Sequence, residues 1–219
     1  MTRLSSEQRR AAIIRAAVRV IARDGLGAAT TRAIVAEARM SLASFHYAFH
    51  SRDEMIRHLI AFVIENERLA IIGSLRPGVD IRTSVRVGIQ AYFDLVVREP
   101  GREQAMFELL HYALRTPELG DLPRLLYGSY HGVVAEILLA GAEHAGVEWS
   151  IPIDDLARLA VSLTDGLTLA WLADRDVTAA GRLMDSMADA LAAFARTASA
   201  RTAATPPDST PARIKEHSA

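Results

Sequence analysis

The sequence predicts an all-α protein with a small basic head and a larger acidic helical body. Apolar residues recur at spacings of three and four along nearly the whole chain, which is the period of an amphipathic helix, and no convincing strand is expected. The formal charge is only −1 overall, but residues 1–58 carry a net charge of +5 and residues 59–219 one of −6. A basic excess confined to one short segment is typical of a module that binds nucleic acid.

The first two helices have clear boundaries in the sequence. Ser5 and Gln8 have the spacing of a capping box, in which each side chain caps the backbone N–H of the other at a helix start. The helix that follows ends before Gly25, a residue suited to the left-handed position after a helix. A short second helix is expected to begin at the pair Thr30-Thr31.

The third and fourth helices are also marked by capping residues. Ser41 is the expected N-cap of a third helix that runs to about residue 48. Ser51 and Glu54 form a second capping box, and the long fourth helix that it opens continues to a break at Pro77-Gly78. The fourth helix therefore starts in the basic segment and continues into the acidic one.

Five more helices are expected beyond this break. Clusters of proline, glycine or aspartate separate them, and their ranges are about 81–98, 102–115, 122–145, 153–174 and 178–199. We therefore predict three parts: a DNA-binding head at 1–58, with the fourth helix bridging to about 74, a body at 59–199, and a disordered tail at 200–219 that is rich in Pro, Thr and Ala.

The composition excludes several classes of protein. The chain has no cysteine, so disulfides, thiolate zinc sites and cysteine nucleophiles are excluded. Its N-terminus is polar and charged without an apolar stretch behind it, and no run of 18 apolar residues occurs. We therefore expect a cytoplasmic protein that neither is secreted nor spans a membrane.

A helical-bundle enzyme is the main alternative, but the sequence contains no recognisable catalytic motif. Phosphate-binding glycine loops are missing, and Gly128-Ser-Tyr-His-Gly132 places its serine wrongly for a nucleophile elbow. Glu108 and His111 have the spacing of one bundle metal motif, but a di-iron site requires a second motif and two further glutamates. We therefore expect no cofactor and no metal. A small-molecule-binding protein without a DNA role and a purely structural helical module remain as further alternatives.

Two short helices between a longer first helix and a long fourth one are typical of a DNA-binding helix-turn-helix head. From Arg10 to Leu59 the chain resembles the TetR family of transcription regulators, with correct spacing throughout. The residues that carry the resemblance are Ala16, Ala17, Gly25, Thr31, Ile34, Val35, Ala36, Met40, Ser41, Phe45, His46, Tyr47, Phe49, Ser51, Arg52 and Met55. The resemblance implies a TetR-like architecture, in which a helical body binds a ligand and dimerises.

Two positions depart from the family's pattern. Arg39 stands in the turn where the family usually has glycine, and a non-glycine residue in a left-handed turn costs about 1 kcal/mol. His46 stands where the family usually has tyrosine, while Tyr47 beside it retains an aromatic hydroxyl. DNA binding is expected to survive both changes, but the operator sequence cannot be transferred from a relative.

The family's DNA-binding roles are carried over to eight positions. Thr31 and Arg32 are expected at the groove edge, where Arg32 can pair with a guanine. Arg52, at the start of the fourth helix, is expected to clamp a phosphate. The predicted DNA-binding set is Thr31, Arg32, Leu42, Ala43, Ser44, His46, Tyr47 and Arg52.

Aromatic and methionine side chains with a few polar tips predict an apolar ligand pocket in the body, although each of them fits an ordinary core equally well. The predicted ligand-binding set is Tyr92, Met106, Phe107, His111, Tyr112, Tyr130 and Trp171. The last two helices are predicted to form the dimer seam, the second of them through Leu183, Met187, Leu191 and Phe194. We therefore expect a homodimer that binds double-stranded operator DNA, more often a repressor than an activator, and releases it when a small-molecule effector binds.

Overall fold

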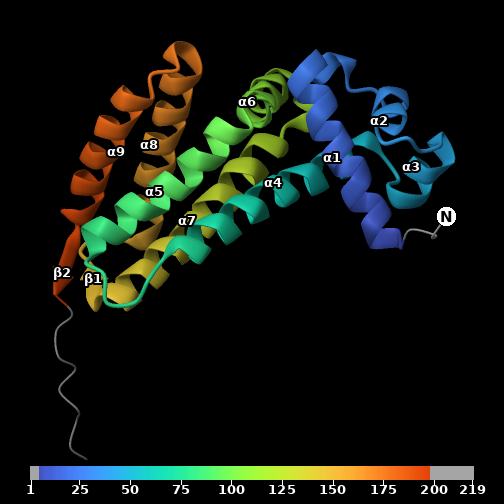
Figure 1. Cartoon of the computed structure of the whole chain (residues 1–219). Helices are drawn as coiled ribbons and strands as arrows, with labels where there is room; N and C mark the ends of the chain where they lie inside the picture. Colours follow the sequence, from blue (N-terminus) through green and yellow to red (C-terminus); the bar gives the residue numbers. More distant parts are fainter. Residues whose placement is uncertain (1–4, 198–219) are drawn as a thin grey trace, which may run out of the picture.

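The computed structural model describes residues 5–197 of the chain, and within them it is almost entirely helical (Figure 1). The all-α prediction is thereby confirmed. The helices are α1 (Ser6–Asp24), α2 (Thr31–Glu37), α3 (Leu42–Ala48), α4 (Arg52–Ser74), α5 (Ile81–Arg98), α6 (Pro100–Arg115), α7 (Leu122–Ala145), α8 (Ile153–Asp174) and α9 (Val177–Ala192), with 3₁₀ turns η1 (Leu26–Ala28) and η2 (Pro117–Leu119) and strands β1 (Val147–Trp149) and β2 (Ala195–Thr197).

The molecule is elongated, with α2 and α3 at one end and α8 and α9 at the other (Figure 1). The long helices α4, α5 and α7 run side by side between the two ends. Helix α4 is about 34 Å long at ~1.5 Å per residue, so it reaches from the head deep into the body.

The helix starts follow the capping residues found in the sequence. Ser5 and Gln8 form the complete capping box, with Gln8 N–H donating to Ser5 Oγ at 3.1 Å and Ser5 N–H donating to Gln8 Oε1 at 2.9 Å. The second box is only half formed, because the Glu54 carboxylate accepts from His50 N–H at 2.7 Å while Ser51 Oγ accepts from Glu54 N–H. Gly25 has the positive φ expected of it, 83°, but its ψ of 163° is extended rather than left-handed helical.

Two predictions about the end of the chain need correction. Helix α9 ends at Ala192 rather than near residue 199, and strand β2 pairs antiparallel with β1, although no strand is predicted from the sequence. The backbone bond from Ser150 N–H to the Phe194 carbonyl, 2.7 Å, begins this pairing. Each strand has three residues, too short for an alternating pattern to be recognisable in a sequence. The predicted tail at 200–219 lies outside the described residues.

The described residues contain two apolar cores. One joins α1–α3 to most of α4, to α6 and to the start of α7, and the other joins α5, α8 and α9 to the end of α7. The first core therefore continues past residue 58, and a division of the chain there falls inside α4. The exact domain boundary stays a prediction.

Three contacts fasten the head to α6 and α7. Gly101 lies so close to α1 that a Cβ at this position would stand 2.9 Å from the Ala22 Cβ. The Glu108 carboxylate accepts a hydrogen bond of 2.7 Å from Leu26 N–H in the loop after α1. Arg57 of α4 forms an ion pair of 2.7 Å with Asp121 in front of α7. The head is therefore attached to the body by backbone contacts as well as by apolar packing.

Helices α7 and α8 are long and apolar enough to cross a membrane by length and composition alone. In the structure, however, both are bundle helices: α7 packs against α4, α5 and α8, and α8 packs against α9. One side of α8 is buried in the second core. Their apolar character is therefore explained by packing within the helical body.

The close approach of α6 to α1 leads to a stability prediction. Gly101→Ala should lower the free energy of unfolding by about 1–2 kcal/mol, because the new methyl group must push α6 and α1 apart. Gly73→Ala in α4 is the matched control, since a Cβ there has no neighbour within 4 Å and alanine favours the helix by about 0.5–1 kcal/mol. Urea unfolding of both variants measures the difference, and equal effects would contradict the close contact.

Candidate functional site

The turn between α2 and α3 fixes how α3 is presented at the surface. Arg39 adopts φ of 55°, the left-handed conformation expected of the residue that replaces glycine here. Its N–H donates to the Ala36 carbonyl at 3.0 Å, and Met40 N–H donates to the Val35 carbonyl at 2.8 Å. These two bonds close the end of α2, and Ser41 then caps α3 by accepting from Ser44 N–H.

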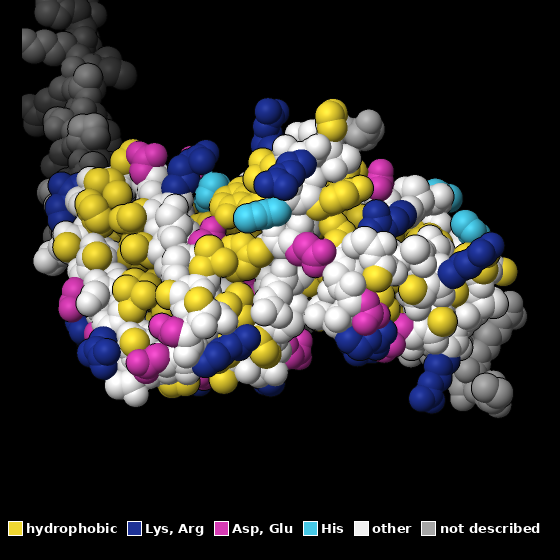
Figure 2. Space-filling view, turned by 90° about the horizontal axis from the view of Figure 1, so that it is seen from above, with side chains coloured by type: hydrophobic (Ala, Val, Ile, Leu, Met, Phe, Trp, Pro, Cys, Tyr) yellow, Lys and Arg dark blue, Asp and Glu magenta, His cyan; other side chains and the backbone are white. Residues whose placement is uncertain are grey.

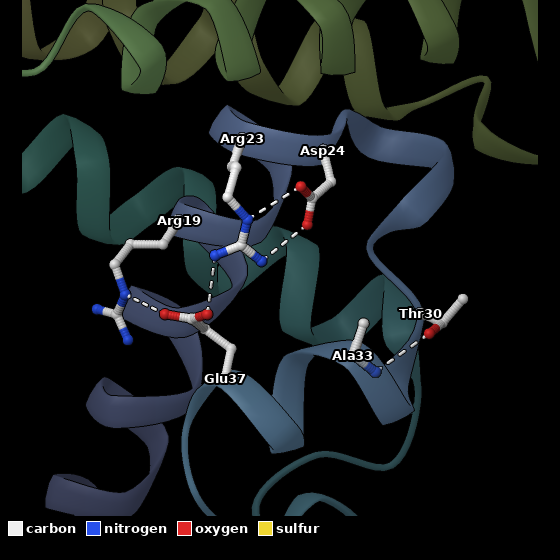
Figure 3. Close-up of polar contacts among 6 residues, drawn as sticks. All are labelled: Arg19, Arg23, Asp24, Thr30, Ala33 and Glu37. Atoms are coloured by element: carbon white, nitrogen blue, oxygen red, sulfur yellow. Dashed lines mark hydrogen bonds and ion pairs between the residues drawn. The ribbon is translucent and has the colours of Figure 1, made fainter.

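Ion pairs hold α2 against α1 (Figure 3). The Glu37 carboxylate at the end of α2 accepts from Arg19 at 2.7 Å and from Arg23 at 3.1 Å, and Arg23 also pairs with Asp24. The two guanidinium groups hold the pKa of Glu37 below its ordinary value. At the other end of α2, Thr30 Oγ1 accepts from Ala33 N–H. The ion pairs thus hold the end of α2 against α1, and the Thr30 cap stabilises its start.

Helix α3 has an inner apolar face and an outer one that is open to solvent. Phe45 is buried and packs against Phe49, with their ring centroids 5.6 Å apart. On the outer face, Tyr47 is 69% exposed and Leu42 is 40% exposed. The remaining exposed residues of this face are Ala43 and His46.

Three further features decide which side chains of the head remain available. The Ser44 hydroxyl is half-buried and lies 3.0 Å from the Ser41 hydroxyl, so it is already engaged within the helix start. The Arg9 guanidinium stacks on the Tyr47 ring at 4.9 Å from its centroid, which brings a positive charge from α1 to the outer face of α3. On α2, Thr31 is half-buried and Arg32 is exposed.

Arg52, the expected phosphate clamp, makes two hydrogen bonds within the head. Its Nε donates to the Ala29 carbonyl at 3.2 Å and its Nη2 donates to the Leu26 carbonyl at 3.0 Å. The side chain is half-buried between α4 and the loop after α1. Arg52 thus holds that loop in place, and its expected contact to a DNA phosphate stays a prediction.

The body contains a cavity of about 120 Å³ among α4, α5, α6, α7 and α8. Its walls are mostly apolar, and Trp149 of β1 and Leu191 of α9 complete them. Four of the residues predicted to bind ligand line this cavity: Tyr92, Met106, Phe107 and Tyr130.

The other three predicted ligand residues lie elsewhere. His111 and Tyr112 are exposed on α6 and are not among the residues that line the cavity. Trp171 is buried in the second core, where its ring meets Phe93 edge-on at 5.6 Å and lies under the Arg175 guanidinium. These three residues therefore do not line the cavity, since sequence spacing does not fix which face of each helix meets it, and a ligand-binding role for them stays a prediction.

The sequence analysis also missed the acidic groups of the cavity. Glu67 of α4 and Glu103 of α6 line it and are almost completely buried. Arg102 donates to Glu103 Oε1 at 2.7 Å and lies 3.6 Å from Glu67 Oε1. Burial raises the pKa of Glu67 well above its ordinary value, and the neighbouring Glu103 adds to this effect. Burial also raises the pKa of Glu103.

A third carboxylate, Asp165 of α8, lines the same cavity. Its Oδ2 accepts a hydrogen bond of 2.6 Å from the Tyr127 hydroxyl, and burial raises its pKa. The Tyr92 hydroxyl lies 2.8 Å from Thr168 Oγ1 on the same face of α8. The sequence did contain a signal for these residues. Glu67 stands three residues after Ile64 and four before Ile71, and Asp165 stands four residues after Val161. These spacings place each acidic residue on the same helix face as apolar residues that line the cavity.

The predicted dimer seam is also partly wrong. Met187 and Leu191 are only 2% exposed and pack in the core beside α5, so neither is available to a second subunit. Phe194 is half-buried against the same core. Exposed apolar side chains nevertheless gather at the end of the body that carries α8 and α9 (Figure 2). They include Leu169, Val177 and Leu183, of which Leu183 was predicted by name and Leu169 lies in the first of the two helices predicted to form the seam.

Comparison with known families decides the identity of this arrangement. Residues 13–59 match the family model described as bacterial regulatory proteins, tetR family. Residues 80–196, more than half of the chain, match the model of the C-terminal part of BetI-type transcriptional repressors. The chain belongs to the TetR family. It is a DNA-binding transcription regulator, and the family and its relatives are regulators rather than enzymes.

Individual TetR-family proteins support the same conclusion. The HTH-type nicotine-responsive transcriptional repressor HdnoR of Paenarthrobacter nicotinovorans is 30% identical over 188 residues, which cover 86% of this chain and 96% of that protein. The structure of a TetR-family regulator from Marinobacter aquaeolei VT8 is similar with a TM-score of 0.61, 19% identity, and coverage of 83% and 94%. The fatty acid degradation regulator FadR from Bacillus halodurans gives a TM-score of 0.67, 15% identity, and coverage of 87% and 96%. At these identities the two structures show the shared fold.

The buried carboxylates of this TetR-family body predict a pH-dependent stability. A carboxyl whose pKa is raised in the folded state binds its proton more tightly folded than unfolded, so the free energy of unfolding falls as the pH rises from about 4.5 through the raised pKa. Glu67→Gln should therefore be more stable than the parent at pH 8, and its stability should depend less on pH between 5 and 8. Glu143→Gln, at an exposed position of α7, should leave the dependence unchanged in urea unfolding.

Proposed function

We propose that the chain binds a palindromic operator in the cytoplasm as a homodimer and releases it when a largely apolar small molecule enters the cavity of the body. The observation that carries the proposal is the outer face of α3, where a large aromatic and an apolar side chain stand exposed to solvent. They lie in a segment of net charge +5, as expected of a surface that meets DNA.

The proposed DNA contacts divide into base readout and backbone positioning. Tyr47 and His46 supply polar tips for base edges, and Leu42 and Ala43 suit thymine methyl groups. Arg32 makes no ion pair within the described residues, which supports a contact to a guanine or a phosphate. The predicted roles of Thr31 and Ser44 stay in the proposal as contacts at the margin of the groove.

The exposed apolar side chains of α8 and α9 support the proposal of a homodimer. Leu169 is 51% exposed and Val177 is 57% exposed, at the end of the molecule opposite the head. Two copies that meet there place their heads on either side of a two-fold axis, which requires a two-fold symmetric DNA site. Helices with mostly small or apolar outer residues allow the close approach that such a seam needs.

The proposed release mechanism is mechanical. Helix α4 carries Met55 and Leu59 in the core of the head, and Ile64, Glu67 and Ile71 in the wall of the cavity. A molecule that moves the wall therefore moves the head and changes the distance between the two copies of α3. The relative HdnoR is a nicotine-responsive repressor, which supports a small organic molecule as the signal.

DNA binding is tested with labelled DNA from the region upstream of the chain's own gene. Fluorescence anisotropy should detect a dimer on a symmetric site, and with ~6–8 phosphate contacts the slope of log affinity against log salt should be roughly −5 to −7. A monomer on a short unsymmetrical site would contradict the proposal, and ligand binding without any DNA binding would favour the small-molecule-binding alternative.

Tyr47→Ala should weaken binding to the symmetric site by about 1–3 kcal/mol and affect random DNA less, because the ring is proposed to reach a base. Tyr112→Ala is the matched control, since Tyr112 is also an exposed tyrosine but lies on α6. The same anisotropy titration measures both variants. Equal losses on the two DNAs would reduce Tyr47 to a backbone contact.

A further inference from the structure

The cavity contains a buried acidic oxygen that no group of the described residues satisfies. Glu67 is 4% exposed, and its Oε1 has no hydrogen-bond partner. Its nearest cation, Arg102, is 3.6 Å away and is already bonded through Nε and Nη2 to Glu103 Oε1. A buried carboxylate oxygen without a donor is costly unless a bound group supplies one.

Acidic side chains outnumber basic ones around the cavity. Three carboxylates line it, those of Glu67, Glu103 and Asp165, and Arg102 lies between the first two. Arg68 also lines the cavity, but its guanidinium is bonded to Glu65 at 2.8 Å and to Glu136 at 2.9 Å. Arg68 is therefore matched by two carboxylates of its own, so the three acidic groups of the cavity are left with one neighbouring cation among the described residues, Arg102.

Aromatic rings surround these carboxylates. The rings of Tyr92, Tyr127 and Tyr130 line the cavity, together with Phe107 and Trp149. The faces of aromatic rings attract cations, and the attraction is strongest where water is excluded. The Tyr127 hydroxyl already donates to Asp165, which orients that ring in the wall and leaves Glu67 as the acidic group with an open oxygen.

We propose that the effector of this cavity is an organic cation, an apolar or aromatic body with one protonated amine, whose N–H donates to Glu67 Oε1. A molecule without a donor group would leave this oxygen unpaired, a neutral donor would make a weaker hydrogen bond to it than a cationic one, and an anion would face three acidic groups. The inference of cation binding stands on the cavity alone, while its consequence for DNA rests on the proposed function.

The test is a charge series on a single ring system, measured by isothermal titration at pH 7.5 with the full chain. The probes are 1-naphthylmethylamine, which is cationic, 1-naphthalenemethanol, which is neutral, and 1-naphthoate, which is anionic. The cation should bind at least about 10-fold more tightly than the alcohol, which corresponds to ~1.4 kcal/mol, and the anion should bind most weakly. Equal affinities, or tighter binding of the alcohol or the anion, would overturn the inference.

Two variants test whether the cationic probe contacts Glu67. Glu67→Gln should remove most of the preference for the amine over the alcohol and leave the affinity for the alcohol within about 3-fold. Glu143→Gln removes the same charge from an exposed position of α7 and should leave the preference unchanged. An unchanged preference in Glu67→Gln would show that the cation does not sit at Glu67. The charge series on the parent protein tests the inference even if this variant does not fold.

A second readout separates this inference from the proposed function. The same three probes are added to the complex with upstream DNA, and the anisotropy is followed. If the amine binds as expected but does not lower the affinity for DNA, the cavity is a cation site and the release mechanism is wrong. If the alcohol binds best and releases DNA, the release mechanism stands and the cation inference is overturned.

Discussion

The structure depends on α4 being buried in two places at once. Its first turns carry Met55, Ile56 and Leu59 into the core that holds α1–α3 together, and its later turns form a wall of the cavity with Ile64 and Glu67. A helix does not kink sharply without a proline, a glycine–serine pair, a bulge or an inserted group; none of the 23 residues of α4 is a proline, and its Gly73-Ser74 pair stands at its very end. Head and body therefore share one stiff element, and the remaining contacts between them, such as that of Leu26 with Glu108, act on its surroundings.

The acidic groups of the cavity stand out from the rest of the body. Apolar side chains at these positions would pack without the cost of removing a charge from water, so Glu67 and Glu103 are poor choices for stability alone. Arg102 relieves part of this cost by its hydrogen bonds to Glu103, but Glu67 Oε1 has no hydrogen-bond partner among the described residues. Buried carboxyl groups are common in binding sites that are arranged before the ligand arrives. The two apolar cores supply the stability that offsets the desolvation of Glu67 and Glu103.

Sequence reasoning succeeded where the information is local. Ser5, Ser41 and Ser51 cap helices where expected, and Arg39 has the left-handed conformation inferred from the family's glycine. It failed where a residue's role depends on how a helix is rotated in the bundle: Trp171 and Met187 have the right chemistry for a pocket and a seam but face the second core. Arg52 shows the same limit, because only the folded loop reveals the carbonyls of Leu26 and Ala29 that its guanidinium meets.

The two tryptophans of the chain occupy different environments, and this gives the molecule two separate optical reporters. Trp149 is in the cavity wall, with its indole N–H donating to the Leu138 carbonyl at 3.0 Å, so its emission responds to whatever occupies that space. Trp171 is enclosed between Phe93 and Arg175 near the end of α8, and its emission responds to changes in the packing of α8 against α5. With one indole replaced by phenylalanine at a time, occupancy of the cavity and rearrangement of the bundle become distinguishable as separate events in time.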